Sequence, residues 1–148
     1  MTEQYVSGAL RRLVTERAAG YCEYCRCPTK YSAQSFAVEH IIPRHADGPT
    51  VADNLALAYQ GCNAHKSIKT MAVDPITSVS VPLFHPRQHR WREHFSWSED
   101  FTEIMGLTPT GRATVAVLQL NRAGLIHLRR VLYAFGEHPP VEPLQSEK

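Results

Sequence analysis

Apolar residues recur at helical intervals near both ends of the chain. They predict one helix over residues 7–19 and helical structure again from residue 111 to about 135, with a break at Asn121. The segments between them carry shorter patterns. These predict strands over 36–42 and 55–59, a polar loop over 44–53, a short helix over 62–69, and a β-hairpin with arms at 94–97 and 101–107.

This mixture of helices and short strands predicts an α+β fold in a single domain. With 148 residues the chain is long enough to bury roughly two-thirds of its unfolded surface. We expect the domain to span residues 1–138, with its core over about 20–70 and a C-terminal extension over about 75–138. The tail over 139–148 contains several prolines and is expected to be disordered.

Composition and charge restrict the class of protein. Hydrophobic residues make up 43% and charged residues 20%, which is the balance of a soluble globular protein. The net charge of +2 is too small for a heavily basic nucleic-acid coat. No stretch approaches the roughly 18 apolar residues of a membrane span, and the N-terminus lacks an export pattern. We therefore expect a cytoplasmic protein without a membrane partner.

Three polar clusters between residues 38 and 66 combine the groups that phosphodiester hydrolysis needs. Glu39 adjoins His40, Asn54 follows, and Asn63 and Lys66 complete the run. A neutral imidazole can take a proton from water near pH 7. Carboxylate and amide oxygens suit a hard cation such as Mg²⁺. A lysine three residues after an asparagine shares its helix face and could contact a phosphate.

The ordered Glu-His, Asn and Asn-x-x-Lys run resembles the HNH endonuclease motif, with Asn63 in the third position. The resemblance implies a metal-dependent nuclease with a ββα-metal (His-Me finger) core, here with an N-terminal helix, a small antiparallel sheet and C-terminal helices. It also implies a DNA substrate and His40 as the general base. Glu39 and Asn63 would then bind the catalytic Mg²⁺ or another divalent cation, and Asn54 would hold the loop that orients the His40 ring.

The adjacent positions of Glu39 and His40 raise a geometric difficulty. Neighbouring residues of a strand point to opposite faces, so the two side chains cannot both face one phosphate in a regular strand. They can converge only if the backbone twists or ends there, and Pro43 is consistent with such an ending.

Cysteines predict a possible second metal site. In a reducing cytoplasm they are better interpreted as thiolate ligands than as disulfides. Cys22 and Cys25 have the spacing of half a zinc knuckle. Many relatives in the HNH family carry a second CxxC, and here Cys62 fills its last place while Tyr59 stands at the partner position. If Zn²⁺ is bound by Cys22, Cys25 and Cys62, then Cys27, His45 or His65 would complete the site. Otherwise the site is metal-free and Tyr59 packs into the vacancy. The alternative is a set of reduced, buried cysteines that pack as small hydrophobic groups.

Basic residues near the motif are candidates for contacts with the DNA backbone. Arg44, Lys66 and Arg87 are the three that we assign to this role, although a solvated surface would explain Arg87 equally well. The rival function is a non-catalytic zinc-type nucleic-acid-binding module in which His40 is structural. The sequence leaves base specificity and oligomeric state open.

Overall fold

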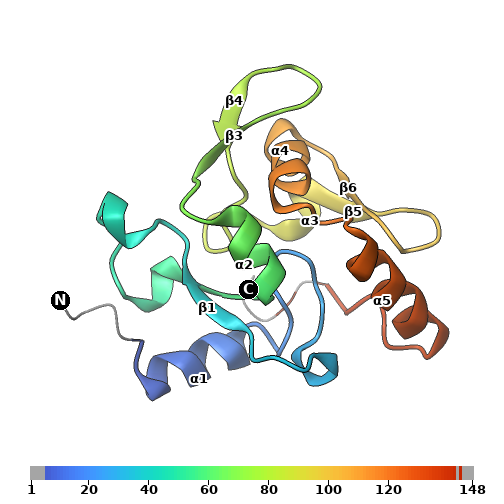
Figure 1. The fold of residues 1–148 in the computed structure, drawn as a ribbon, viewed down its shortest axis with the longest axis horizontal. Helices are drawn as coiled ribbons and strands as arrows, with labels where there is room; N and C mark the ends of the chain where they lie inside the picture. Colours follow the sequence, from blue (N-terminus) through green and yellow to red (C-terminus); the bar gives the residue numbers. More distant parts are fainter. Residues whose placement is uncertain (1–5, 143, 145–148) are drawn as a thin grey trace.

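A computed structural model describes residues 6–142 and 144, and it shows a mixed fold of helices and small antiparallel sheets (Figure 1). Within these residues, three pairs of strands form separate two-stranded sheets: β1 with β2, β3 with β4, and β5 with β6. The elements in chain order are α1 (Gly8–Arg17), β1 (Ala37–His40), β2 (Leu55–Ala58), α2 (Gln60–Lys66), β3 (Met71–Val73), β4 (Ser80–Pro82), α3 (Trp91–His94), β5 (Phe95–Trp97), β6 (Ile104–Gly106), α4 (Pro109–Leu118) and α5 (Ala123–Ala134). Three short 3-10 turns accompany them: η1 (Thr29–Tyr31), η2 (Arg44–Ala46) and η3 (Ala52–Asn54).

The centre of the chain runs strand, strand, helix. β1 and β2 pair antiparallel with His40 opposite Leu55, and α2 follows β2 directly. All four side chains of β2 are buried, so this strand forms the inner edge of the hydrophobic core. This order is consistent with a ββα core.

The first helix forms where the sequence predicts it. Ser7 caps α1 by accepting a hydrogen bond from the Leu10 backbone N–H at 3.1 Å, and Val14 buries its side chain in the core. Ala19 and Gly20, at φ +55° and +78°, both adopt the left-handed backbone that follows the end of this helix, and glycine takes this conformation without strain.

The C-terminal extension also follows the predicted pattern. β5 and β6 form the expected hairpin, and α4 and α5 are separated by a turn at Asn121. The Asn121 side chain bonds the backbone N–H and carbonyl of Ile104 at 2.7 and 2.9 Å, so the break between the helices is fastened to β6. The short helix α3 and the strand β3 were not predicted.

Described residues near the C-terminus contact the rest of the molecule. His138 is buried with its Nε2 2.9 Å from the Phe101 carbonyl oxygen. Glu142 accepts two hydrogen bonds from the Arg26 guanidinium at 2.8 and 2.9 Å. Leu144 is buried as well, whereas positions 143 and 145–148 lie outside the described residues. Along the described chain, no helix combines the length and apolar character needed to cross a bilayer.

Partial burial of several histidines makes stability depend on pH. Desolvation lowers the pKa of each below the value of about 6.5 for a free imidazole. The folded state therefore favours the neutral rings, and their contribution is fully present above about pH 6.5 and is lost as the pH falls through the folded pKa values. The histidines concerned are His40, His85, His89, His94 and His138.

We therefore predict that the free energy of unfolding decreases between about pH 7 and about pH 5. Urea titrations across this range measure it. His94→Gln removes a half-buried ring and should reduce the slope of stability against pH, whereas His127→Gln, on the exposed face of α5, should leave the slope unchanged. Equal slopes for both variants would contradict this explanation.

Candidate active site and cysteine cluster

His40 closes β1 and is the best-placed proton acceptor of the motif. Its ring is partly exposed, and its Nε2 lies 2.8 Å from the Thr50 hydroxyl oxygen. Burial and then the charge of Arg44 lower the pKa of His40. The imidazole is accordingly neutral at pH 7, with its ring orientation set by Thr50.

Asn54 fastens the loop that carries Thr50. Its side-chain oxygen accepts a hydrogen bond from the Ile42 N–H at 2.9 Å. Its amide nitrogen donates to the Ile42 and Pro49 carbonyls at 3.0 and 2.9 Å. This buried amide therefore joins the two ends of the loop between β1 and η3, which is the arrangement an orienting residue requires.

Gly48 is a necessary part of the same loop. A Cβ at this position would lie 1.7 Å from the Ile42 carbonyl oxygen and 2.9 Å from the Asn54 amide nitrogen. Only glycine allows the backbone to come this close. The Asp47-Gly48-Pro49 turn signal marks the loop in the sequence but does not show this close approach.

Glu39 points to the opposite side of β1, into the core. One carboxylate oxygen accepts a hydrogen bond from the Tyr24 hydroxyl, and the other lies 3.1 Å from Lys66 Nζ. Burial raises the pKa of Glu39, while Lys66 and Tyr24 act against that shift. Glu39 and His40 therefore lie on opposite faces of β1, as the alternation of a regular strand predicts.

Lys66 differs from its expected role as a phosphate contact. Only 1% of the residue is exposed, and its Nζ donates to the Ile41 carbonyl at 2.9 Å in addition to pairing with Glu39. The ammonium group is thus committed to the core, and neither oxygen of Glu39 is free for a cation. Asn63 lies one turn earlier on α2 and is partly exposed.

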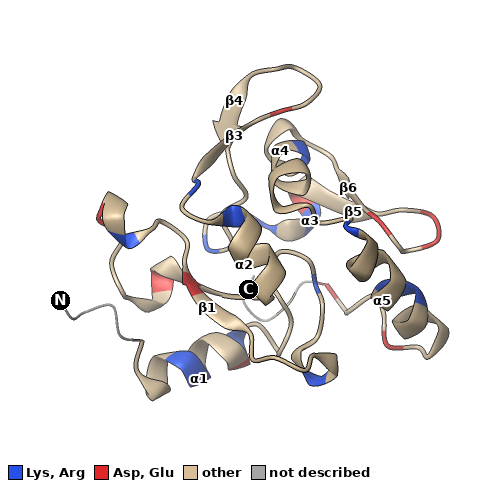
Figure 2. Ribbon diagram, in the orientation of Figure 1, with Lys and Arg blue, Asp and Glu red and all other residues tan. Residues whose placement is uncertain are grey.

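The two candidate arginines have different environments. Arg44 lies on η2 beside His40 and is half-buried. Arg87, in the extension, places its guanidinium against the buried carboxylate of Glu23. Figure 2 shows that Lys and Arg occur on α1, α2, α4 and α5, so the basic residues are distributed over several elements.

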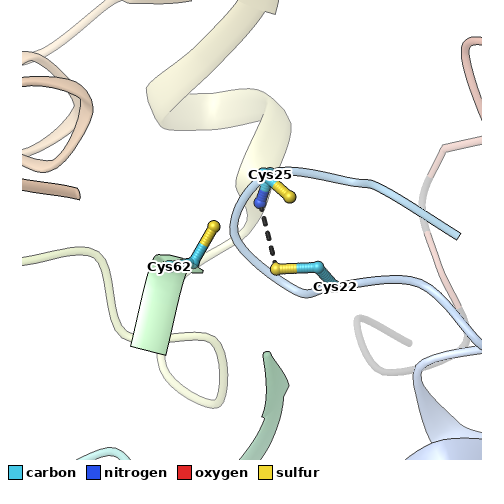
Figure 3. Close-up of side chains that lie close together, drawn as sticks. All are labelled: Cys22, Cys25 and Cys62. Atoms are coloured by element: carbon cyan, nitrogen blue, oxygen red, sulfur yellow. Dashed lines mark hydrogen bonds between the residues drawn. The ribbon is translucent and has the colours of Figure 1, made fainter. Parts of the chain in front are cut away.

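Cys22, Cys25 and Cys62 meet inside the protein, as their spacing predicts. Their sulfur atoms all lie within 4.8 Å of one another, and all three residues are buried (Figure 3). Cys22 Sγ accepts hydrogen bonds from the backbone N–H groups of Tyr24 and Cys25 at 3.4 and 3.3 Å. Burial raises the pKa of Cys22, but hydrogen bonds from the Cys25 and Cys62 thiols, together with backbone hydrogen bonds from Cys25 and Tyr59, lower the pKa well below its usual value. The cluster suits a soft cation such as Zn²⁺.

The fourth corner of the cluster is not filled by a candidate ligand from the sequence. Among the described residues, the close group of His, Cys, Asp and Glu atoms contains only the three cysteines. Cys27 directs its thiol to the Pro28 carbonyl at 3.7 Å. Tyr59, at the position of the missing cysteine, packs instead on Phe36 with 5.2 Å between ring centroids.

Arg122, which sequence reasoning missed, approaches the cluster from the extension. Its Nη2 lies 3.5 Å from Cys62 Sγ, and its guanidinium carbon lies 5.6 Å from the Tyr59 ring centroid. The carbonyls of Leu118 and Gln119 at the end of α4 hold its other terminal nitrogen at 3.2 and 3.1 Å. Zn²⁺ bound by three thiolates would carry one negative charge, which this guanidinium would neutralise.

Residues 22–69 match the family model described as HNH endonuclease. The match covers the CxxC turn, β1, β2 and α2, and it confirms the resemblance to this family over that segment. Neither the curated proteins nor the solved structures contain a match to the chain. An HNH segment indicates nuclease activity or nucleic-acid binding.

The Asn54 clamp leads to a prediction about the His40 ring. Asn54→Ala removes three hydrogen bonds, each worth a net ~0.5–1.5 kcal/mol. Asn121→Ala is a matched control because it also removes three hydrogen bonds, two to the backbone of Ile104 and one from the Arg129 guanidinium, at a site in the extension. We expect both variants to lose stability, while only Asn54→Ala changes the imidazole NMR signals of His40. Unchanged signals in folded Asn54→Ala would rule out the orienting role.

The cysteine cluster leads to a prediction about zinc. Protein purified without chelator should contain about one equivalent of zinc, and Tyr59→Cys should raise zinc affinity and melting temperature because it completes a thiolate set. Arg122→Ala should lower zinc affinity, and Arg122→Lys should retain part of it because the positive charge remains. Metal analysis and chelator competition measure these effects. Less than about a tenth of an equivalent in the parent protein would exclude a structural zinc.

Proposed function

We propose that the protein is a divalent-metal-dependent endonuclease that hydrolyses DNA phosphodiester bonds. The observation that carries the proposal is the environment of His40, a partly exposed imidazole whose pKa is lowered by burial and by Arg44. Such a ring is in the base form near neutral pH. The match of residues 22–69 to the HNH endonuclease model supports the same conclusion.

The proposed chemistry assigns each ring nitrogen of His40 a role. A neutral imidazole has one donor and one acceptor nitrogen. If Nε2–H donates to the Thr50 hydroxyl, then Nδ1 is the acceptor. Nδ1 takes a proton from water as the water oxygen forms a bond to phosphorus, and the bond from phosphorus to the leaving oxygen breaks. Asn54 contributes by holding the loop that positions Thr50.

The resemblance also implies a catalytic Mg²⁺, which would stabilise charge on the phosphate and on the leaving oxygen. The described residues fit this cation only in part. Asn63 offers an amide oxygen on α2, but both oxygens of Glu39 are held by Tyr24 and Lys66. The role proposed for His40 rests on its own geometry and does not depend on where the cation binds.

The inward position of Glu39 and Lys66 favours the rival function, a non-catalytic zinc-type nucleic-acid-binding module. In that case the buried ion pair would be a structural element and His40 would have no substrate. The two functions differ in one simple assay. Plasmid DNA is incubated with the purified protein in Mg²⁺ or in EDTA. A metal-dependent endonuclease produces nicked or linear DNA in Mg²⁺ and not in EDTA, whereas a binding module produces neither form in either condition.

For the enzyme, we predict that His40→Ala lowers the cleavage rate by roughly 10²–10⁴-fold, because it removes only the general base. His45→Ala is the matched control, since His45 is exposed and lies in the same loop. The cleavage rate should fall as the pH drops through the pKa of His40, which lies below the usual value of about 6.5. Initial rates on plasmid DNA at a series of pH values measure both effects.

Two further observations complete this test. Circular dichroism and DNA-binding measurements should show that His40→Ala remains folded and still binds DNA. A His40→Ala protein that cuts at the wild-type rate after careful purification would overturn the proposed mechanism.

A further inference from the structure

A polar pocket of about 420 Å³ lies between the end of α1, the turn η3 and the segment 85–88. Its walls come from segments far apart in the sequence, and their polar groups converge on one hollow. The lining residues are Arg17, Asp53, His85, Arg87 and Gln88.

The two arginines of this pocket hold hydrogen-bond donors without acceptors. Each guanidinium is fixed by one nitrogen: Arg17 Nη2 donates to the Leu55 carbonyl at 2.8 Å, and Arg87 Nη2 donates to the Glu23 carboxylate. The Nε of Arg17 and the Nε and Nη1 of Arg87 are buried, with no partner among the described residues. The Arg87 side chain is only 8% exposed. Buried donors of this kind are unfavourable unless an acceptor reaches them.

The electrostatics of the pocket favour an anion as that acceptor. Burial and the charge of Arg87 lower the pKa of Arg17, so the two guanidinium groups repel each other, while the carboxylates of Glu23 and Asp53 act against that shift. Glu23 neutralises Arg87 in part from beneath, and Asp53 is exposed. The Nδ1 of His85 accepts a hydrogen bond from the backbone N–H of Arg87 at 3.2 Å. The Nε2 of the neutral ring therefore carries the proton and is a further donor.

The strand pair β1–β2 links this pocket to the candidate general base. Leu55, whose carbonyl holds Arg17, is the register partner of His40 in the β1–β2 pair. Partner residues of antiparallel strands lie about 4.5–5.5 Å apart at Cα. The guanidinium of Arg17 is thus anchored directly across the ladder from the residue that we assign to the base.

We propose that Arg17 and Arg87 form a phosphate-binding subsite for the nucleic-acid strand, holding a phosphate other than the one that is cleaved. This inference rests on the proposed function and deepens it by assigning the part of the substrate that the pocket holds. Guanidinium groups suit this ligand because their planar forks match the oxygens of a phosphate. The arginines would fix the position of the strand, and His40 would act on the neighbouring bond.

The test uses Arg17→Gln and its matched control Arg12→Gln. Both remove one positive charge from α1, but Arg12 is exposed and lies outside this pocket. The variants are made in a His40→Ala background, and binding of a short DNA duplex is measured between about 50 and 200 mM salt. Arg17→Gln should weaken binding and reduce the slope of log affinity against log salt by about 0.9, the value for one lost phosphate contact. Arg12→Gln should leave both unchanged.

Arg87 needs a double variant because removing it alone would leave the buried carboxylate of Glu23 unpaired. Glu23→Gln combined with Arg87→Gln removes both charges. The glutamine keeps a side-chain oxygen that can accept the hydrogen bond that the Leu57 backbone N–H donates to Glu23 at 2.9 Å. Glu23→Gln alone is its control. The double variant should show the same loss of salt slope as Arg17→Gln, with thermal melting confirming that the protein is folded.

A small substrate separates failure of the subsite from failure of the proposed function. Bis(4-nitrophenyl) phosphate has a single phosphodiester and no neighbouring phosphate, so the parent protein should hydrolyse it, and Arg17→Gln with His40 intact should lose a larger factor of rate on DNA than on this small substrate. Equal affinity and salt slope for Arg17→Gln and Arg12→Gln overturn the subsite, as does an equal loss of rate by Arg17→Gln on DNA and on the small substrate. If the parent protein binds DNA with a salt slope that Arg17→Gln reduces but cleaves neither substrate, the proposed endonuclease activity is wrong and the proposed phosphate-binding subsite still stands.

Discussion

The buried ion pair between Lys66 and Glu39 is the interaction on which the candidate site depends. It fastens α2 to β1, and the hydroxyl of Tyr24 joins the cysteine turn to the same carboxylate. Removing one partner of such a pair typically costs about 3–5 kcal/mol, because the other charge stays buried alone. Since adjacent strand residues face opposite ways, the inward direction of Glu39 also fixes the outward direction of His40. The burial of Glu39 in the core and the outward direction of His40 therefore depend on the same strand geometry.

Local patterns were sufficient to predict much of the fold. The order of β1, β2 and α2, the hairpin of β5 and β6, and the break between α4 and α5 follow from apolar spacing and turn residues, which act over short distances. The meeting of Cys22, Cys25 and Cys62 was predicted from the spacing of the first two and the family-like place of the third. The hydrogen bonds of Asn54 to the backbone follow from its burial, because a buried amide must satisfy its own donors and acceptor.

The directions of long charged side chains could not be predicted in the same way. Lys66 has the helix position expected of a phosphate contact, yet its ammonium group finds the Ile41 carbonyl and Glu39 within the core. Arg17 and Arg122 acquire their surroundings from segments far away in the sequence, so no local pattern reveals them. Whether such a residue is a surface charge or a buried partner depends on tertiary packing, which pattern and propensity do not specify.

The turn at residues 22–27 shows how closely the two halves of the chain are joined. The extension supplies Arg87 for the Glu23 carboxylate, Trp91 for the Tyr24 carbonyl and Arg122 for the Cys62 sulfur on α2. Glu142, in the tail, pairs with the Arg26 guanidinium. A chain cut after α2 would leave these groups without their partners and the core open to water. We therefore expect that residues 22–69, which match the HNH model, do not fold alone, because fusion or transfer of this segment would remove the contacts that cover its interior.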